Sequence, residues 1–542
     1  MENKYGILAL DLGTSGAKAA LVTLDGNCRA WAMEKLPLII RGTTGAEQDP
    51  NAWWKAVDRA ATRVIAQDTI PREHILAVST SSMGEETVAV DKAGNPLMNA
   101  LNWMDQRGAQ TIKAQLKGWL NAPGLGYGLS NLMQWIWYTG GIPSPSGKDP
   151  AGHITHIRDH HPKIYEATHK FLNSLDFINL KLTGEFVATH DSILPLWVTN
   201  NRNLKRIRYE PRLITALGLD RERLPDLVPS TTVLGPLKSK LSQAWGLASH
   251  VKVVAGAVDT SAATLGSGAV GDFIPCLTLG TSSFITAHLP FKKTHIRTNM
   301  ASFPCAHPGK YLLMNNQTMA GGCLSHLAHK MVYHRDELLR EKESPDMYKI
   351  FDTIAARVPP GSNGLVYTPW LFGERSPADD QTLRGSLHNL SLHNTREDVV
   401  RSVFEGVALN SRWLMEGVKK FLKQPCADLR MAGGGACSDI WCQIYADVLD
   451  CRIHQIQNPI ESNARGAAFI GAVGLGELEF EALPQRVPIQ RVYTPNPRHR
   501  NLYDHRYARF REFYKNTRSI FGRLNAPTGK GNSHAGPHVP TP

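Results

Sequence analysis

Apolar residues in this chain come in short runs, each followed by glycine or by small polar residues. The first run, residues 7–10, is too short for a helix and predicts a buried strand. A second run follows at residues 19–22, and the chain between them includes Leu-Gly-Thr-Ser-Gly over residues 12–16. Two apolar runs around a glycine-rich segment predict a strand, a tight turn and a returning strand.

Alternating strands and helices are predicted for the rest of the chain. Asp49 followed by Pro50 predicts a helix with Asp49 as its N-cap and Pro50 at its first position. Residues 106–245, which glycine and proline interrupt, are predicted to be mostly helical insertions that decorate the first domain. The predicted helices span residues 50–67, 395–421 and 438–449. The predicted strands span residues 5–10, 17–24, 28–35, 75–81, 87–90, 251–255 and 429–432.

The strand–turn–strand pattern occurs a second time, much later in the chain. Residues 276–279 are followed by Gly280, Thr281 and Ser282, and then by the apolar residues 284–285. Glycine lets the backbone approach a ligand closely, and bare amides in such a turn can bind phosphate oxygens. An ordinary β-hairpin is the alternative for either turn alone. The repeat favours two equivalent halves that face each other across a cleft, each offering a phosphate-binding loop.

Length and composition are those of a two-domain globular enzyme. The chain has 542 residues, of which 42% are hydrophobic and 20% are charged. No apolar run reaches the roughly 18 residues that a membrane span needs. Because the first predicted strand begins almost at Met1, we expect no signal peptide. The eight cysteines are scattered and include no Cys-x-x-Cys motif, so we expect reduced thiols, a cytoplasmic location and no membrane partner.

A net charge of +12 raises the question of nucleic-acid binding. The charge is dispersed except in residues 486–523, where aromatic residues stand at positions 503, 507, 510, 513, 514 and 521. This spacing fits one helix face packed on a core better than a base-stacking platform, so we expect no nucleic-acid partner. The tail, residues 525–542, has almost nothing to bury and is predicted to be disordered.

A group of histidines suggests a metal site at first sight. No pattern such as His-Glu-x-x-His supports such a site, so we expect these histidines on a solvated helix surface. They are His153, His156, His160, His161 and His169.

Polar residues at the ends of the predicted strands are candidates for binding a metal ion and phosphate. Asp11 follows the first strand, and its carboxylate is suited to holding Mg²⁺ through water. Thr14 adds a hydroxyl and Lys18 a cation to the same hairpin. Asp259 stands between an apolar strand and a segment of small residues. From the residues alone, it is either a catalytic base or a helix N-cap.

Four motifs, in their order and spacing, resemble those of the FGGY carbohydrate kinases, most of all the xylulose kinase branch. The resemblance covers about residues 5–524. It implies an α/β fold with two ribonuclease H-like (actin/hexokinase-type) domains, a sugar-binding domain over 1–250 and a nucleotide domain over 251–524, with a cleft between them. The motifs are Asp-Leu-Gly-Thr-Ser from Asp11, Ala-Gly-Ala-Val-Asp-Thr up to Thr260, Leu-Gly-Thr-Ser-Ser from Leu279, and Ala-Gly-Gly-Gly-Ala up to Ala436.

The resemblance implies a role for each candidate residue, with ATP and Mg²⁺ as cofactors. Asp259 matches the catalytic aspartate, which would accept the proton of a substrate hydroxyl as that hydroxyl attacks the γ-phosphorus. Asp11 matches the metal position. The phosphate loops match Gly13, Thr14, Lys18, Gly280, Thr281 and Ser282. The base and ribose are expected near Gly321, Gly434, Gly435, Ser438 and Asp439, and the sugar near Met83, Glu85, Trp103 and Thr260.

The substrate-binding strand end departs from the branches of this family. Xylulose kinases usually carry Gln-Met-His-Gly there, whereas this chain has Ser-Ser-Met-Gly-Glu over residues 81–85. Glycerol kinases carry Arg-Glu, whereas Gly84 precedes Glu85 here. We expect phosphorylation of a terminal hydroxyl of a small sugar or polyol, with a xylulose-like ketose favoured.

Several alternatives to this activity stay open. They are a kinase for another polyol or a sugar acid, a non-catalytic sugar- or nucleotide-binding regulatory relative, and an actin-like ATPase. A homodimer is compatible with the sequence, which does not fix the number of subunits.

Overall fold

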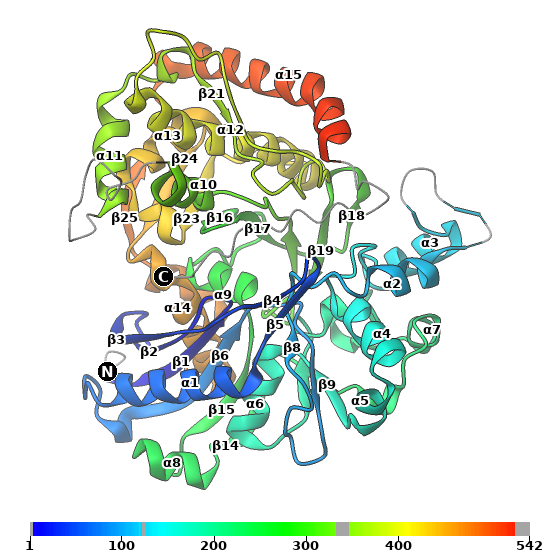
Figure 1. Ribbon diagram of the computed structural model, residues 1–542. Coiled ribbons are helices and arrows are strands. Elements are labelled where there is room, and N and C mark those ends of the chain that lie inside the picture. The colour runs from blue at the N-terminus through cyan, green and yellow to red at the C-terminus, as the bar shows by residue number, and fades with distance from the viewer. Residues whose placement is uncertain (1–3, 119, 122–125, 332–345, 526–542) are drawn as a thin grey trace, which may run out of the picture.

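Two β-sheets, one from each half of the chain, form the centre of the protein (Figure 1). The computed structural model describes residues 4–118, 120–121, 126–331 and 346–525. The predicted disordered tail lies outside the described residues, except for Asn525, which ends helix α15 (Arg500–Asn525). Within the described ranges, no helix is both long and apolar enough to span a membrane.

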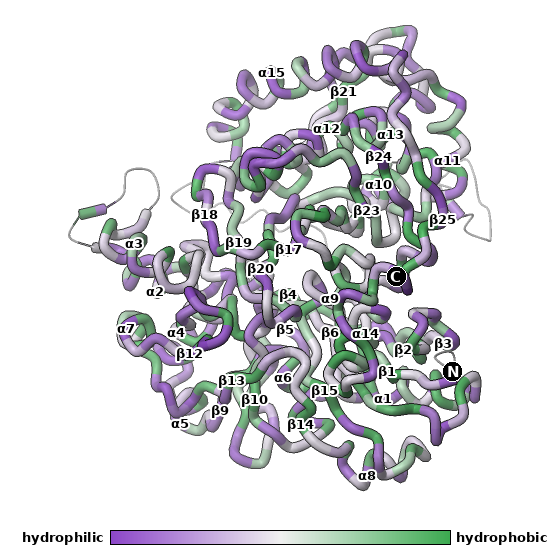
Figure 2. The backbone as a smooth tube through the Cα atoms, turned by 180° about the vertical axis from the view of Figure 1, so that it is seen from behind, coloured by the Kyte–Doolittle hydropathy of each residue, from purple (hydrophilic) through white to green (hydrophobic). Residues whose placement is uncertain are grey.

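The first sheet contains the predicted N-terminal hairpin. Strand β1 pairs antiparallel with β2 and parallel with β6, and β6 pairs parallel with β15. The central strands β1, β6 and β15 are almost entirely buried because both faces of the sheet are covered. Figure 2 shows hydrophobic stretches along this part of the chain. Its order is β14 (Val233–Pro236), β15 (Lys252–Val258), β6 (Ile75–Ser82), β1 (Gly6–Gly13), β2 (Gly16–Thr23) and β3 (Cys28–Lys35).

The second sheet repeats this arrangement around the second glycine-containing turn. Strand β16 pairs antiparallel with β17 and parallel with β23, as β1 does with β2 and β6. The sequence repeat therefore corresponds to a repeat in the fold. The order is β18 (Thr294–His295), β19 (Met300–Pro304), β20 (Tyr311–Met314), β17 (Ser283–Leu289), β16 (Cys276–Leu279), β23 (Asp428–Ala432), β24 (Arg452–Ile456) and β25 (Ile489–Tyr493).

The two halves meet at helices α9 (Asp259–Gly266) and α14 (Ser462–Gly474) (Figure 1). Glycines let these helices approach closely: a Cβ at Gly266 or Gly466 would lie 1.8 Å from a backbone oxygen of the other helix. Helix α14 also packs on the first sheet, although it follows β24 in the chain. Strand β15, which the sequence analysis placed at the start of the second domain, lies in the first sheet because it pairs with β6.

Smaller strands and helices surround the two sheets. The predicted helix that Asp49 begins is confirmed, because the Asp49 side chain accepts a hydrogen bond from the Asn51 amide. The remaining strands are β4 (Ile39–Arg41), β5 (Gly45–Gln48), β7 (Val88–Val90), β8 (Ala100–Leu101), β9 (Lys170–Leu172), β10 (Val187–Thr189), β11 (Thr199–Asn200), β12 (Arg208–Tyr209), β13 (Asp226–Val228), β21 (Val366–Thr368) and β22 (Ser386–His388). The remaining helices are α1 (Pro50–Ile65), α2 (Ala109–Leu116), α3 (Leu129–Tyr138), α4 (Pro150–His160), α5 (Pro162–Ala167), α6 (Ser174–Thr183), α7 (Pro211–Ala216), α8 (Ser239–Trp245), α10 (Gly321–His326), α11 (Met347–Arg357), α12 (Arg396–Leu422) and α13 (Asp439–Leu449).

The expectation that the histidine group is solvated is wrong for His153 and His156. Both are buried on α4, and a ring nitrogen of His153 lies 3.1 Å from the Thr87 hydroxyl. Burial lowers the pKa of each to about 4, so both are neutral at pH 7. The first of these histidines is therefore a core residue with a hydrogen-bond partner.

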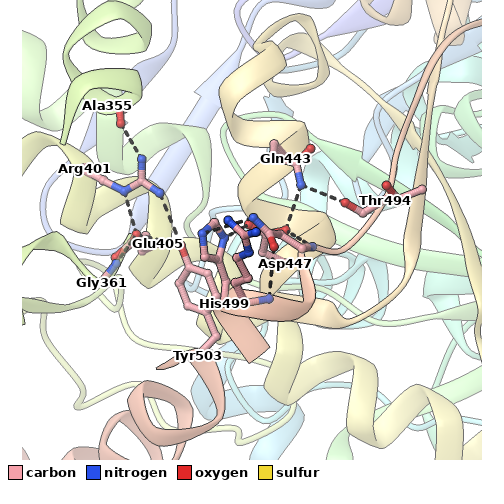
Figure 3. Close-up of polar contacts among 11 residues, drawn as sticks. Ala355, Gly361, Arg401, Glu405, Gln443, Asp447, Thr494, His499 and Tyr503 are labelled. Atoms are coloured by element: carbon pink, nitrogen blue, oxygen red, sulfur yellow. Dashed lines mark hydrogen bonds and ion pairs between the residues drawn. The ribbon is translucent and has the colours of Figure 1, made fainter. Parts of the chain in front are cut away.

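Helix α15 crosses the outside of the second half and is largely hydrophilic along its length (Figure 2). Its aromatic face packs on the core as predicted, with Tyr503, Tyr507 and Phe510 buried. Figure 3 shows how polar contacts fix it: the Arg401 and Glu405 side chains of α12 pair at 2.8 Å, and the Tyr503 hydroxyl donates to Glu405 at 2.9 Å. The basic surface helix is thus tied into the core of the second half.

Candidate active site

Three charged residues gather where the central strands of the first sheet end. Asp11 on β1 lies opposite Lys18 on β2 in the strand register, and the Lys18 ammonium donates to the Asp11 carboxylate at 2.9 Å. The positive charge of Lys18 is favoured first by Asp11 and also by Asp259, and together they raise its pKa despite burial. The structure thus brings together the residues predicted to bind metal, bind phosphate and act as base.

Asp259 is the first residue of α9, and its N-cap is Val258, so Asp259 itself does not cap the helix. Desolvation and, next, the neighbouring charge of Asp11 raise the pKa of Asp259, whereas hydrogen bonds from Thr260 and the charge of Lys18 lower it, and the resulting pKa is about 6. The Thr260 hydroxyl donates to the Asp259 carboxylate at 3.1 Å. A carboxylate with a pKa close to neutral is suited to accept a proton at physiological pH.

The turn between β1 and β2 is held by side chains from later in the chain. The Trp103 indole donates to the Thr14 hydroxyl at 3.0 Å, and that hydroxyl donates to the Met83 sulfur at 3.4 Å. The side chain of Gln48, at the end of β5, donates to the Thr14 carbonyl at 2.9 Å. The side-chain amide of Asn102 donates in turn to the Gln48 side-chain oxygen at 3.2 Å. The predicted phosphate-binding and substrate-binding residues therefore contact each other directly.

The end of strand β6 carries the predicted substrate residues. The Met83 amide donates to the Leu12 carbonyl at 2.8 Å, which places it beside the hairpin. Glu85 has a φ of +71°, a left-handed conformation that non-glycine residues seldom adopt. Such conformations cluster at functional sites, where the surrounding structure holds them in place. A Cβ at Gly84 would be in ordinary contact with Val258, which places this strand end next to the start of α9.

The second turn, Gly280 to Ser282, is held by backbone groups. The amide of Gly321, the first residue of α10, donates to the Gly280 carbonyl at 2.8 Å, and the Ala320 amide donates to the Thr281 carbonyl at 2.8 Å. A Cβ on Gly321 would lie 2.6 Å from the Gly280 carbonyl oxygen, closer than real contacts allow. Gly321 is glycine because this backbone approach leaves no room for a side chain.

The glycine run after β23 has one open position. A Cβ at Gly434 would meet no atom within 4 Å, whereas one at Gly435 would lie 2.5 Å from the Leu279 side chain. Ser438 caps α13, accepting from the Trp441 amide at 3.2 Å and donating to Asp352 at 2.7 Å. The exposed Asp439 accepts from the Tyr493 hydroxyl at 2.7 Å. Of these predicted nucleotide residues, Gly434 leaves the most space for a ligand.

Comparison with known proteins decides the family. The description "FGGY family of carbohydrate kinases, N-terminal domain" matches residues 6–266, and the corresponding C-terminal domain matches residues 276–475. The chain belongs to the FGGY family of carbohydrate kinases. The predicted resemblance and the two-domain α/β fold are confirmed, and the protein is a carbohydrate kinase of a family that uses ATP.

Relatives of this FGGY kinase carry more than one substrate name. The chain is 26% identical over 528 residues to a xylulose kinase of Staphylococcus epidermidis, covering 96% of this chain and 99% of that protein. It is 25% identical over 499 residues to a gluconokinase of Bacillus licheniformis, covering 90% and 91%. Identities this close to each other do not separate the two sugars.

Solved structures agree on the FGGY fold. A ligand-bound xylulose kinase from Lactobacillus acidophilus superposes with a TM-score of 0.82 at 22% identity, covering 96% of this chain and 100% of that one. A gluconate kinase from the same organism superposes with a TM-score of 0.81 at 23% identity, covering 96% and 99%. These likenesses concern the fold.

The predicted site residues of the FGGY kinase fall into two groups, one at each sheet. At the first sheet Lys18 pairs with Asp11, and Thr14 contacts Met83 and Trp103. Gln48, which binds Thr14, and Asn102, which binds Gln48, were missed by the sequence analysis. Gly280 and Gly321 contact each other at the second. Helix α9, which Asp259 begins, joins the groups: the Thr264 hydroxyl lies 2.8 Å from that of Thr286 on β17. Gln48 is 34 positions away from Thr14 in the sequence, so no local sequence pattern predicts their contact.

Proposed function

We propose that this FGGY kinase transfers the γ-phosphate of ATP to a terminal hydroxyl of a small sugar, with Asp259 as the base. The observation that carries the proposal is the arrangement of Asp259 beside the ion-paired Asp11 and Lys18. Asp259 accepts the hydroxyl proton as the sugar oxygen bonds to the γ-phosphorus and the bond to the β-phosphate oxygen breaks. Lys18, in the first hairpin, is placed to offset phosphate charge. We also propose that the enzyme is cytoplasmic, and a homodimeric assembly stays a prediction.

The donor set around Asp11 fits a hydrated Mg²⁺. Within the described residues, no group of three or more histidine, cysteine, aspartate or glutamate side chains is placed to hold a metal. Mg²⁺ is usually held by one or two carboxylates, water and substrate phosphates, which a single carboxylate such as Asp11 satisfies. When bound, the ion would neutralise charge on the phosphates.

A xylulose-like ketose is the favoured substrate, with Met83, Glu85, Trp103 and Thr260 as its contacts. The family match and the near-full-length likeness to xylulose kinases support this choice. Glu85 can accept hydrogen bonds from vicinal hydroxyls, and Trp103 offers an apolar face to the carbon chain.

A sugar acid is a second candidate because Lys148, which has Arg375 as a neighbour, lies near Glu85 at the same strand end. The Lys148 ammonium lies 5.6 Å from the centre of the Phe372 ring. Burial and, next, the nearby Arg375 lower the pKa of Lys148, which Glu85 and Asp379 oppose. Neither Lys148 nor Arg375 forms an ion pair with another described residue. A carboxylate on the substrate would supply a partner for both cations.

The experiment is ADP release with Mg-ATP against D- and L-xylulose, ribulose, gluconate, glycerol and erythritol, for the wild type and Asp259→Ala. We expect one sugar to stimulate strongly and Asp259→Ala to lower kcat by about 10²–10⁴-fold. Lys148→Met is expected to raise the KM for gluconate and leave that for a neutral ketose unchanged if the sugar acid is the substrate. No stimulation by any sugar, or full activity of Asp259→Ala, would contradict the proposal.

A further inference from the structure

The backbone that leads into Asp259 is irregular. The register between β15 and β6 shifts between Val254 and Ala257, as it does at a β-bulge. Gly256 has a φ of +75°, and a Cβ there would lie 1.9 Å from the Thr80 carbonyl oxygen. After this bend the strand pairs with β6 again through Ala257 and Val258, and α9 begins at the next residue, so we expect the position of the Asp259 carboxylate to depend on how firmly this segment is held.

Hydrogen bonds to other parts of the first half hold the bend, among them one from the Ala255 amide to the Thr232 carbonyl at 2.9 Å. The Asn179 side chain donates to the Ala255 carbonyl at 2.7 Å. The Gly256 amide donates to the Ser230 carbonyl at 3.0 Å. The Val258 amide donates to the Asp191 carboxylate at 3.2 Å, one residue before Asp259. The last of these bonds reaches closest to the catalytic position.

Asp191 connects several of the groups that hold the bend. It is 1% exposed, and its other carboxylate oxygen accepts from the Thr189 hydroxyl at 2.6 Å and from the Ser230 hydroxyl at 3.2 Å. Ser230 therefore holds the bend twice, through its own carbonyl and through Asp191. Three hydrogen-bond donors on one buried carboxylate fix its orientation.

Helix α9 lacks an N-terminal cap of its own. Its N-cap residue, Val258, has no polar side chain, and no side-chain hydrogen bond caps the helix. The amide of an N-cap residue is one of the donors without a partner inside the helix, and a side chain within the first turn often accepts from it. Here Asp191 accepts from it instead, from the loop that follows β10.

We propose that Asp191 is a positioning residue that holds the β15–α9 junction so that the Asp259 carboxylate meets the substrate hydroxyl. This inference rests on the proposed function, because it takes Asp259 as the base. Losing the Asp191 carboxylate leaves the buried Val258 amide without this acceptor and removes the hydrogen bond that holds the junction closest to Asp259, while the bonds at Ala255 and Gly256 remain. A displacement of about 1 Å at a reacting group can lower the rate by about 10²-fold.

The test compares four full-length variants with the wild type: Asp191→Ala, Asp191→Asn, Asp176→Ala and Asp259→Ala. Asp176 is the matched control, because it is equally buried and accepts from the Ser192 hydroxyl at 2.7 Å and from the Asn173 amide at 3.0 Å, outside the bend. The measurements are kcat, the KM values for ATP and sugar, and Tm for each folded variant.

We expect Asp191→Ala to lower kcat by about 10- to 100-fold with both KM values within twofold of the wild type. Asp191→Asn keeps an oxygen for the Val258 amide, and its amide group can donate to the two hydroxyls, so its kcat is expected within threefold. Asp176→Ala lowers Tm and leaves kcat within threefold. Equal kcat in Asp191→Ala and the wild type, or equal losses in Asp191→Ala and Asp176→Ala, would overturn the inference.

The Asp259→Ala variant distinguishes failure of the proposed base from failure of the positioning role of Asp191. If Asp259→Ala keeps full activity, the base assignment fails and the proposed function with it. If Asp259→Ala is inactive while Asp191→Ala keeps the wild-type kcat, the base stands and only the positioning role of Asp191 fails.

Discussion

The two glycine-containing turns have similar sequences and are held in different ways. At the first, the Thr14 hydroxyl and carbonyl are bound by the side chains of Trp103 and Gln48. At the second, the Gly280 and Thr281 carbonyls are bound by backbone amides at the start of α10. Two similar Gly-Thr-Ser segments are thus stabilised differently: side chains hold the first turn, and backbone amides hold the second.

Substitutions at the two turns are therefore expected to have different effects. The first turn lies among charged and polar side chains, including Asp11 and Lys18, so in the proposed function a substitution there changes the charge that would meet the phosphates. The second turn depends on a close backbone approach at Gly321, so a substitution there changes its shape. We therefore expect mutations at the first turn to act on kcat and mutations at the second to act on stability and nucleotide affinity.

Of the substitutions considered for the two turns, Lys18→Met should lower kcat the most. It removes a cation proposed to offset phosphate charge, and loss of one such group typically lowers kcat by about 10²–10³-fold. Lys18 also lowers the pKa of Asp259, which is about 6 in the wild type, so its removal raises that pKa. Asp259 must be ionised to accept a proton, so the acid limb of the kcat–pH profile should move upward.

Lys18→Arg is the control for this prediction, because it keeps the positive charge beside Asp11. Its acid limb should stay within about 0.3 pH units of the wild type even if the larger guanidinium lowers kcat. An acid limb that does not move in Lys18→Met would show that Lys18 and Asp259 do not interact, contrary to the proposed site.

Gly321→Ala tests the second turn. The added Cβ would lie 2.6 Å from a backbone oxygen that cannot move away alone, so the turn must shift, at a cost of about 1–3 kcal/mol in the free energy of unfolding. We expect a lower Tm and a higher KM for ATP, with kcat changed less than in Lys18→Met.

Gly434→Ala is the matched control in the second half, because its added Cβ meets no atom within 4 Å. Its stability should stay within about 0.5 kcal/mol of the wild type. A rise in its KM for ATP would support the proposed nucleotide position, and equal loss of Tm in both variants would contradict the steric account of Gly321.

Local patterns in the sequence were enough to predict the strands around both turns. Residues 5–10 and 17–24 were predicted as strands and form β1 and β2, and the start of α1 was predicted from Asp49 and Pro50. The motifs then gave the candidate residues, because glycine, threonine and aspartate at strand ends carry a recognisable chemistry.

Contacts between distant segments could not be predicted in the same way. Strand β15 was predicted to start the second domain, yet its parallel pairing with β6 puts it in the first sheet. His153 was expected in solvent because nothing near it in sequence announces the Thr87 hydroxyl. Asp191 and Gln48 were missed for the same reason: their partners, Val258 and Thr14, are set by the packing of the first half.

Trp103→Phe should have the smallest effect on activity among these substitutions. It tests whether the hydrogen bond from the indole to Thr14 contributes to activity. The change removes one hydrogen bond to the Thr14 hydroxyl and keeps an aromatic ring against the proposed sugar position. A single hydrogen bond contributes about 0.5–1.5 kcal/mol, which corresponds to roughly a 2- to 12-fold loss in kcat/KM for the sugar. Trp31→Phe, at a side chain that is 49% exposed, is the control and should match the wild type. If Trp103→Phe also matches the wild type, the Gln48 side chain and the β1–β2 pairing hold the turn without the indole.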